Sequence, residues 1–234
     1  MSKKLIISIT INVLMISILA FISWTHYSEA STKKMTSDVL RPAHYEQRKS
    51  LFESLTISPN DTVMLGDSMV LYNEWQEFFD EPIVNRGIGG DTTSGLLRRL
   101  HTITEGQPKR VVLMIGINDI SRNVPQKKTV LQYEKVLTQI QYQSPNTKIY
   151  TMSVLPVNND IYRKKVHNDD VIAFNKKIMH LSKKYNATFI NIYRLYEQQG
   201  QLKKSYTNDG LHLNGQGYDI WVEALKLYFY GGNE

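Results

Sequence analysis

Four short blocks of the sequence carry groups that acyl transfer requires. They are Gly66-Asp67-Ser68, Gly87-Ile88-Gly89-Gly90-Asp91-Thr92, Gly116-Ile117-Asn118-Asp119 and Asp209-Gly210-Leu211-His212. Together they contain a hydroxyl, glycines that leave backbone N–H groups accessible, an amide side chain, and an imidazole next to a carboxylate. A serine attacks an ester carbonyl only when a base takes its proton, so the first and last blocks would have to meet in space.

The chemistry predicts a role for each of these groups. Ser68 is the candidate nucleophile and His212 its base, while Asp209, three residues earlier, would orient the imidazole and stabilise its charged form. The candidate oxyanion donors are the backbone N–H groups of Ser68 and Gly90 and the side-chain amide of Asn118. Removing one such donor, for example from Asn118, should slow turnover about 10²–10³-fold.

Each block taken alone also fits an ordinary structural role. A serine after a strand commonly caps a helix, and the glycine-rich block can form a tight turn or a phosphate loop. No Gly-Lys-Ser/Thr follows that block, which disfavours a nucleotide P-loop. Asn118-Asp119 can form a turn, and Asp209 with His212 can be a surface pair or half of a metal site. The order of the blocks, each at an expected strand end or helix entrance, favours catalysis.

The remaining histidines give no sign of a metal site. They are His26, His44, His101, His167 and His180. None of them forms a pair at the i, i+4 spacing that places two ligands on one helix face, so we predict no metal and no other cofactor.

The elements between the blocks must bring them together. Five short apolar segments are predicted as strands: Thr62–Leu65, Pro82–Asn85, Arg110–Ile115, Lys148–Val154 and Ala187–Ile192. Apolar residues at helical spacing predict two helices, one with the face Val130, Tyr133, Leu137 and Ile140 and one with the face Val171, Phe174, Ile178 and Leu181. A third helix is predicted within Gly217–Tyr230, and Asn214 would cap it. This alternation predicts an α/β fold with a parallel sheet covered by helices on both faces. In such folds the functional groups lie at the carboxyl ends of the strands.

The N-terminal segment differs from the rest of the chain. Residues 5–24 contain no charged side chain and follow Lys3 and Lys4. A run of about 20 apolar residues can span a bilayer, so we predict one transmembrane helix that anchors the protein in the plasma membrane. The two lysines favour a cytoplasmic N-terminus with the following domain outside. Ser28-Glu29-Ala30 resembles a cleavage site, so secretion after cleavage near Ala30 is the alternative.

The chain is thus expected to have three parts. Residues 1–24 form the anchor or an uncleaved signal, residues 25–60 a juxtamembrane stalk with a leading helix, and residues 61–234 the catalytic domain. The leading helix is predicted from Tyr45, Leu51, Phe52 and Leu55 and would end before Ser58-Pro59-Asn60.

The composition excludes several classes of protein. The chain has no cysteine, which excludes a disulfide scaffold, a thiolate metal site and a cysteine nucleophile. Its net charge is +6, and some of its lysines come in pairs: Lys127-Lys128, Lys164-Lys165, Lys176-Lys177, Lys183-Lys184 and Lys203-Lys204. These pairs are dispersed among acidic residues, so we predict solvated surfaces and no nucleic-acid partner. A weak attraction to anionic envelope polymers or lipid headgroups stays open.

The four blocks resemble those of the SGNH, or GDSL-type, hydrolases over about residues 61–230. The resemblance implies a flavodoxin-like three-layer α/β/α sandwich with a five-stranded parallel sheet. It also implies cofactor-independent ester hydrolysis through an acyl-serine, with Ser68, Gly90, Asn118, Asp209 and His212 in the roles given above. The one departure noted is methionine after the serine, where the family often has leucine, and this change conserves volume.

The platelet-activating-factor acetylhydrolase subgroup is a nearer resemblance. It is carried by the stretch from Val84 to Thr93, by Leu96, Leu97, Arg99 and Leu100, and by Trp75, Phe78 and Phe79. Together with a domain too short for an obvious lid, this resemblance implies a small acyl group. We therefore expect a small ester substrate, such as an acetyl ester of a cell-envelope glycan or lipid. Lysophospholipase or lipase-type activity at the membrane surface and a catalytically idle anchored binding protein are the alternatives. No motif indicates an oligomeric state.

Overall fold

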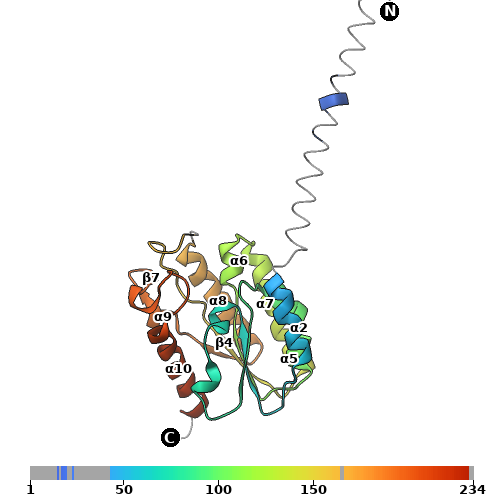
Figure 1. Cartoon of the computed structure of the whole chain (residues 1–234), viewed down its shortest axis with the longest axis vertical. Helices are drawn as coiled ribbons and strands as arrows, with labels where there is room; N and C mark the ends of the chain where they lie inside the picture. The colour runs from blue at the N-terminus through green and yellow to red at the C-terminus, as the bar shows by residue number, and fades with distance from the viewer. Residues whose placement is uncertain (1–14, 16, 20–22, 24–42, 164–165, 232–234) are drawn as a thin grey trace, which may run out of the picture. The chain divides into compact units, whose positions relative to one another are not determined.

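A computed structural model describes Met15, residues 17–19, Ser23, and residues 43–163 and 166–231 (Figure 1). The chain divides into two units between Glu46 and Gln47. The fold described below belongs to the second unit, which contains all four sequence blocks.

The structure contradicts the predicted membrane anchor. In the part of the chain that the structure describes, no helix is both long enough and apolar enough to cross a bilayer. A single-pass anchor requires one continuous helix of about 20 apolar residues, so the predicted location at the plasma membrane is wrong on this finding. Most of residues 5–24, the predicted stalk over residues 25–42 and the cleavage site near Ala30 lie outside the described residues.

Five parallel strands form the central sheet in the order β2-β1-β3-β4-β5. Their bounds are β1 Thr62–Gly66, β2 Ile83–Gly87, β3 Arg110–Met114, β4 Lys148–Met152 and β5 Thr188–Ile190. All five predicted strands are found, with ends that differ from the predictions by a few residues. This strand order is that of flavodoxin-like folds, whose ligand crevice lies where the connections diverge, beside β1 and β3.

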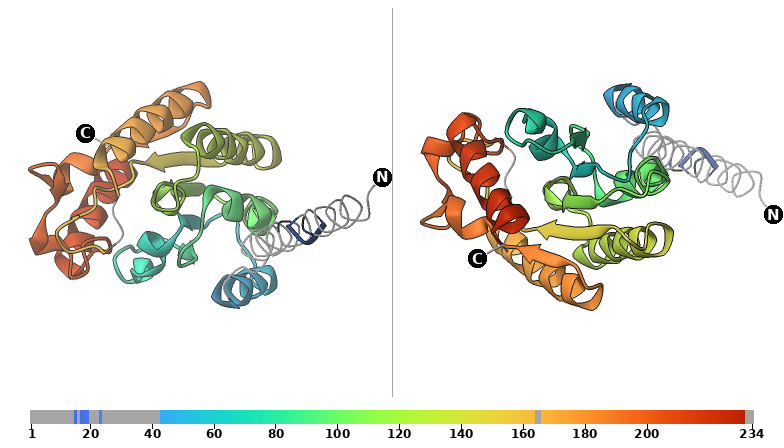
Figure 2. Two further views of the ribbon diagram at one scale, coloured as in Figure 1. Left: turned by 90° about the horizontal axis from the view of Figure 1, so that it is seen from above. Right: turned by 90° about the horizontal axis from the view of Figure 1, so that it is seen from below.

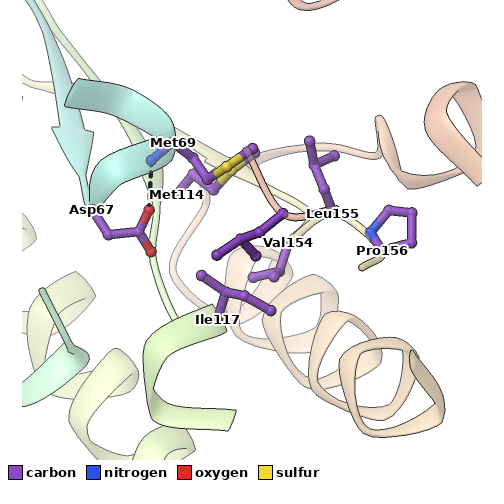
Figure 3. Close-up of a pocket in the computed structure, with 8 residues that line it drawn as sticks. Asp67, Met69, Met114, Ile117, Val154, Leu155 and Pro156 are labelled. Carbon is purple, nitrogen blue, oxygen red and sulfur yellow. Dashed lines mark hydrogen bonds between the residues drawn. The ribbon is translucent and has the colours of Figure 1, made fainter. Parts of the chain in front are cut away.

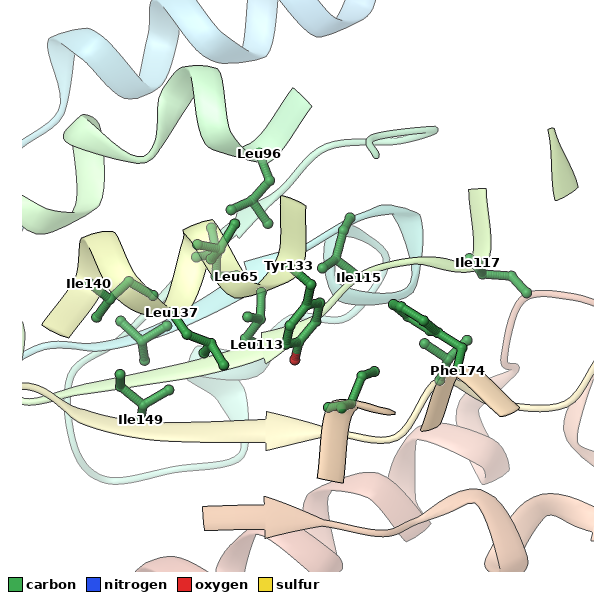
Figure 4. Packing of buried hydrophobic residues seen from close by; sticks show 14 of the residues in the cluster. Leu65, Leu96, Leu113, Ile115, Ile117, Tyr133, Leu137, Ile140, Ile149 and Phe174 are labelled. Atoms are coloured by element: carbon green, nitrogen blue, oxygen red, sulfur yellow. The ribbon is translucent and has the colours of Figure 1, made fainter. Parts of the chain in front are cut away.

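Alternate residues of each strand pack against two different helical layers, because successive side chains of a strand point to opposite faces. One layer contains α4 (Thr93–Arg99), α7 (Gln126–Gln143) and α8 (Asn168–Lys184), and the other contains α3 (Ser68–Leu71), α9 (Tyr193–Tyr196) and α10 (Gly215–Tyr230). Leu65, Leu113 and Ile149 face the first layer (Figure 4). Met64, Val112 and Met152 face the second layer. Figure 1 shows α7 and α10 on opposite sides of β4, and Figure 2 shows helices on both sides of the sheet.

The long helices follow the predicted apolar faces. Tyr133, Leu137 and Ile140 of α7 are buried, and Val130 packs against the same cluster. Val171, Phe174 and Ile178 of α8 are buried, and Leu181 is partly buried. Helix α10 begins two residues before the predicted range, and Asn214 caps it as predicted, because its side chain accepts a hydrogen bond of 3.1 Å from the Gly217 N–H.

Two details differ from the predictions. Helix α2 (Ala43–Ser54) confirms a leading helix and buries Phe52, but Leu51 and Leu55 are 43% and 44% exposed. A short antiparallel pair, β6 (Glu197–Gln198) and β7 (Gln201–Leu202), follows α9. Each strand has only two residues, which is too short to show a two-residue alternation, so no local pattern predicts them.

The remaining short elements are α5 (His101–Thr104), α6 (Ile117–Ser121), and the 3₁₀ turns Trp75–Glu77 and Lys204–Tyr206. Of these, α6 carries Asn118 at the carboxyl end of β3.

Candidate active site

The first site residue, Ser68, lies directly beyond the carboxyl end of β1. The strand ends at Gly66, and Asp67 caps α3 by accepting a 3.0 Å hydrogen bond from the Met69 N–H. A Cβ on Gly66 would lie 2.1 Å from the carbonyl oxygen of Met114, so only glycine allows this close approach of β1 and β3. The capping role that a serine after a strand commonly plays is therefore taken by Asp67, and the Ser68 hydroxyl is left for another contact.

That contact is with His212, far along the chain. The distance between Ser68 Oγ and His212 Nε2 is 2.9 Å, and the distance between His212 Nδ1 and Asp209 Oδ2 is 2.6 Å. An ionised carboxylate only accepts hydrogen bonds, so Nδ1 carries the proton. In the neutral imidazole Nε2 is then the acceptor, and the serine hydroxyl donates to it.

The carboxylate of Asp209 is held by its own loop. Its Oδ1 accepts the backbone N–H groups of Leu211 and His212 at 2.9 and 2.8 Å. Burial raises the pKa of Asp209, but the hydrogen bonds from the imidazole and from these two N–H groups outweigh burial and lower the pKa below its usual range. Gly210 has φ +83°, and a Cβ there would lie 2.7 Å from the Asn158 carbonyl oxygen. The Asp-Gly-Leu-His spacing thus depends on glycine at its second position.

Tyr72, for which no role was predicted, also contacts the imidazole. Its ring packs edge-on against His212, with ring centroids 5.0 Å apart, and the side chain is largely exposed. Such packing restricts rotation of the imidazole. The one sequence feature that linked Tyr72 to the site was its position four residues after Ser68.

The two other predicted oxyanion donors, Gly90 and Asn118, belong to segments that are bonded to each other. Asn118 Nδ2 donates to the Asp91 carbonyl oxygen at 2.9 Å, which leaves its second N–H for another acceptor. Gly90 has φ +72°, a left-handed conformation that glycine adopts without strain. The loop follows β2, and the Ile88 N–H donates to the Gly66 carbonyl oxygen at 3.1 Å, so its first residue lies beside the end of β1.

Two further side chains from the α6 region bind the loop formed by residues 88–93, which we call the oxyanion loop. Asp119 accepts hydrogen bonds from the backbone N–H and the hydroxyl of Thr93, at 3.0 and 2.8 Å. Arg122 Nη2 donates to the Gly90 carbonyl oxygen at 2.8 Å. Burial raises the pKa of Asp119, although the Thr93 hydrogen bonds oppose this effect.

Beneath this loop lies Arg99, a fully buried arginine. Its guanidinium donates to the Asp91 carboxylate at 2.9 Å, to the Arg86 carbonyl oxygen at 2.8 Å and to the Gly66 carbonyl oxygen at 2.9 Å. One side chain therefore joins the ends of β1 and β2 to the oxyanion loop. No role in the site is predicted for Arg99 from the sequence, because a pair of arginines among leucines, Arg98 and Arg99, also fits exposed positions on a short helix.

A small apolar pocket includes sequence neighbours of the site residues in its lining (Figure 3). Its lining consists of Asp67, Met69, Met114, Ile117, Val154, Leu155, Pro156 and Leu211. Asp67 and Met69 flank Ser68, Ile117 precedes Asn118, and Leu211 precedes His212. The cavity volume is about 10 Å³, room for about one water molecule or methyl group.

Asp67 is the one charged residue in that lining. Its Oδ1 accepts from Met69, whereas its Oδ2 is buried and has no hydrogen-bond partner among the described residues. Burial raises the pKa of Asp67 to about 7, and the nearby carboxylates of Asp91 and Asp119 add to this effect. Within the described ranges, no group of three or more acidic or histidine side chains is placed to hold a metal ion.

Comparisons with known proteins agree on one family. A model described as the GDSL-like lipase/acylhydrolase family matches residues 54–220. Platelet-activating factor acetylhydrolase IB subunit alpha2 of Rattus norvegicus is 29% identical over 170 residues, which cover 68% of this chain and 71% of that protein. A solved structure from Streptococcus pneumonia, described as that of a platelet activating factor, is 32% identical, with a TM-score of 0.75 over 86% of this chain and 99% of that one.

Another relative is longer than this chain. The N-acylneuraminate cytidylyltransferase of Escherichia coli is 27% identical over 180 residues, which cover 74% of this chain and 40% of that protein. The chain therefore spans about two fifths of the length of this relative, and the similarity concerns only that part of it.

Proposed function

Because the chain belongs to the GDSL-like lipase/acylhydrolase family, we propose that it is a serine esterase that hydrolyses short-acyl esters through an acyl-serine intermediate. The observation that carries the proposal is the continuous pair of hydrogen bonds from Ser68 through His212 to Asp209, at 2.9 and 2.6 Å. These are the contacts that activate a serine hydroxyl and hold its base in the productive tautomer. We assign the activity to a domain formed by residues 61–234.

The reaction begins at Ser68. Its Oγ attacks the ester carbonyl carbon while its proton passes to His212 Nε2, and the Asp209 carboxylate stabilises the resulting imidazolium. The carbonyl oxygen becomes an oxyanion, which accepts hydrogen bonds from the backbone N–H groups of Ser68 and Gly90 and from the free N–H of Asn118. The ester C–O bond then breaks as His212 gives its proton to the leaving alcohol. Water repeats the sequence on the acyl-serine and releases the acid.

The apolar pocket supports a small acyl group. Part of its lining, Asp67, Met69, Ile117 and Leu211, comes from the sequence neighbours of Ser68, Asn118 and His212, and its volume of about 10 Å³ favours a methyl group over a longer chain. The rat relative is named an acetylhydrolase, which supports the same assignment. We therefore propose acetyl esters of glycans or lipids as the substrate class.

The test is hydrolysis of p-nitrophenyl esters by the purified chain. We expect Ser68→Ala to lower kcat for the acetyl ester by at least about 10⁴-fold, because no other group replaces the nucleophile. Ser50→Ala, at an exposed position on α2, is the matched control and should keep the parental rate. Equal rates for Ser68→Ala and the parent would refute the nucleophile assignment.

Two further measurements test the length of the acyl chain and the alternative that the protein binds without catalysing. Across acetyl, butyryl and octanoyl esters, kcat/KM should fall steeply, because each methylene that the pocket cannot hold costs about 1–3 kcal/mol. A preference for chains of about eight carbons would instead support a lipase-type activity. A fluorophosphonate probe should label the parent at Ser68, and absence of labelling would indicate a binding protein that retains only the fold.

A further inference from the structure

Arg122 lies where a side chain can control one donor of the oxyanion hole. It follows α6, one helical turn after Asn118, and its backbone N–H donates to the Asn118 carbonyl oxygen at 3.2 Å. Its Nη2 donates to the carbonyl oxygen of Gly90 at 2.8 Å and lies 3.3 Å from the position of a Cβ at that glycine. The guanidinium therefore contacts the residue whose N–H is a candidate donor.

We propose that Arg122 is a positioning residue that holds the Gly90 N–H in its donor orientation, an inference that rests on the proposed function. Gly90 has no side chain to restrict its backbone, and its φ of +72° is only one of the conformations open to glycine. An oxyanion donor is effective only when its direction is fixed before the reaction. A charge-assisted hydrogen bond to the carbonyl of the same residue supplies that restraint.

Side chains of α6 and of the residue that follows it hold the oxyanion loop together. Arg122 binds the carbonyl oxygen of Gly90, and Asn118 binds that of Asp91. Asp119 accepts a hydrogen bond from the Thr93 N–H. Burial raises the pKa of Asp119, and the charge of Arg122 opposes this rise. Arg122 is nevertheless exposed, and exposed charge contacts add little to stability. Its effect should therefore appear in turnover and not in folding.

The test compares Arg122→Met, Arg122→Lys and the parent on p-nitrophenyl acetate. Methionine keeps much of the side-chain length without donors, and lysine restores one donor and the charge. We expect Arg122→Met to lower kcat about 10-fold, less than the 10²–10³-fold expected when a donor is removed outright, with KM changed less than about twofold. Lysine should restore part of kcat. The urea midpoint should match that of the parent in both variants.

Arg98→Met is the matched control, since Arg98 is an exposed arginine on α4. Guanidinium ion, added to Arg122→Ala at concentrations far below those that denature, should raise kcat, which a purely structural role would not predict. Parental kcat in Arg122→Met, or an equal loss in Arg98→Met, would overturn the proposal. Either result would leave the proposed function intact as long as Ser68→Ala is inactive.

Discussion

The two halves of the site are built in opposite ways. On one side, Asp209 and His212 are three residues apart, and their side chains are 52% and 26% exposed. On the other side, Arg99 and Asp91 have side chains that are 0% exposed, and Arg99 also binds Gly66, which lies 33 residues earlier. The first half is a local contact open to water, and the second is a buried network that joins separate strands.

This difference assigns two tasks to different parts of the site: the exposed half orients the imidazole, and the buried half stabilises the fold. Exposed ion pairs contribute about 0–1 kcal/mol to stability, so the Asp209–His212 contact orients the imidazole without holding the fold together. Breaking a buried pair leaves an uncompensated charge in the protein interior and is strongly destabilising. We therefore expect substitutions in the first half to remove activity and substitutions in the second half to remove stability.

The largest effect should come from Asp209→Asn. An amide at this position favours the wrong imidazole tautomer, so kcat should fall about 10⁴-fold. The free energy of unfolding should change by less than about 1 kcal/mol, since the contact is exposed. Ester hydrolysis and urea unfolding measure the two quantities on the same samples. Asp219→Asn, at an exposed position on α10, is the control. Unimpaired turnover in Asp209→Asn would mean that the carboxylate has no part in the reaction.

In the buried half, Arg99→Met should lower the stability of the fold. This change removes three hydrogen bonds and leaves the Asp91 carboxylate without its cation, so we expect a loss of about 3–5 kcal/mol in the free energy of unfolding. Urea unfolding measures it, and Arg98→Met, one residue earlier and exposed, is the control. A loss below about 1 kcal/mol would show that the network does not hold the strand ends, and the contrast between the halves would disappear.

The smallest effect concerns Asp67, whose pKa is raised from 3.8 to about 7 in the folded protein. A raised carboxyl pKa means that the folded state binds more protons than the unfolded state between these two values. The contribution of Asp67 to stability is therefore greatest below about pH 4 and falls as the pH rises toward 7. An asparagine side chain is neutral at every pH in this range, so Asp67→Asn does not lose stability through ionisation at this position. Relative to the parent, it should gain about 2–3 kcal/mol between about pH 5 and about pH 8.

Urea unfolding at the two pH values measures this gain. The control is Asp219→Asn, whose exposed side chain should leave the pH dependence of the parent unchanged. If the free energy of unfolding changes with pH in the same way for Asp67→Asn and the parent, the pKa of Asp67 is not raised in the folded protein, and its carboxyl is ionised at neutral pH.

Some of the structure was predictable from local patterns. The five strands and the faces of α7 and α8 follow from apolar spacing, because a strand or helix must bury one side wherever it packs. The Asn214 cap follows from a side chain that reaches its own helix. The exposure of Leu51 on α2 did not follow, since an apolar residue at helical spacing does not reveal whether anything covers it. The anchor predicted over residues 5–24 rested on hydropathy alone, and the described part of the chain contains no spanning helix.

By itself, the sequence determined the strands, the residue types at their ends, and the three-residue spacing that places Asp209 beside His212. Only the tertiary structure decided which distant groups meet. It joins Ser68 to His212 across 144 residues and binds Gly90 to Arg122 across 32. It also buries Arg99 under the oxyanion loop. The physical reason is that periodicity reports which side of an element is covered, whereas a hydrogen bond between elements depends on strand order and register, which no local pattern encodes.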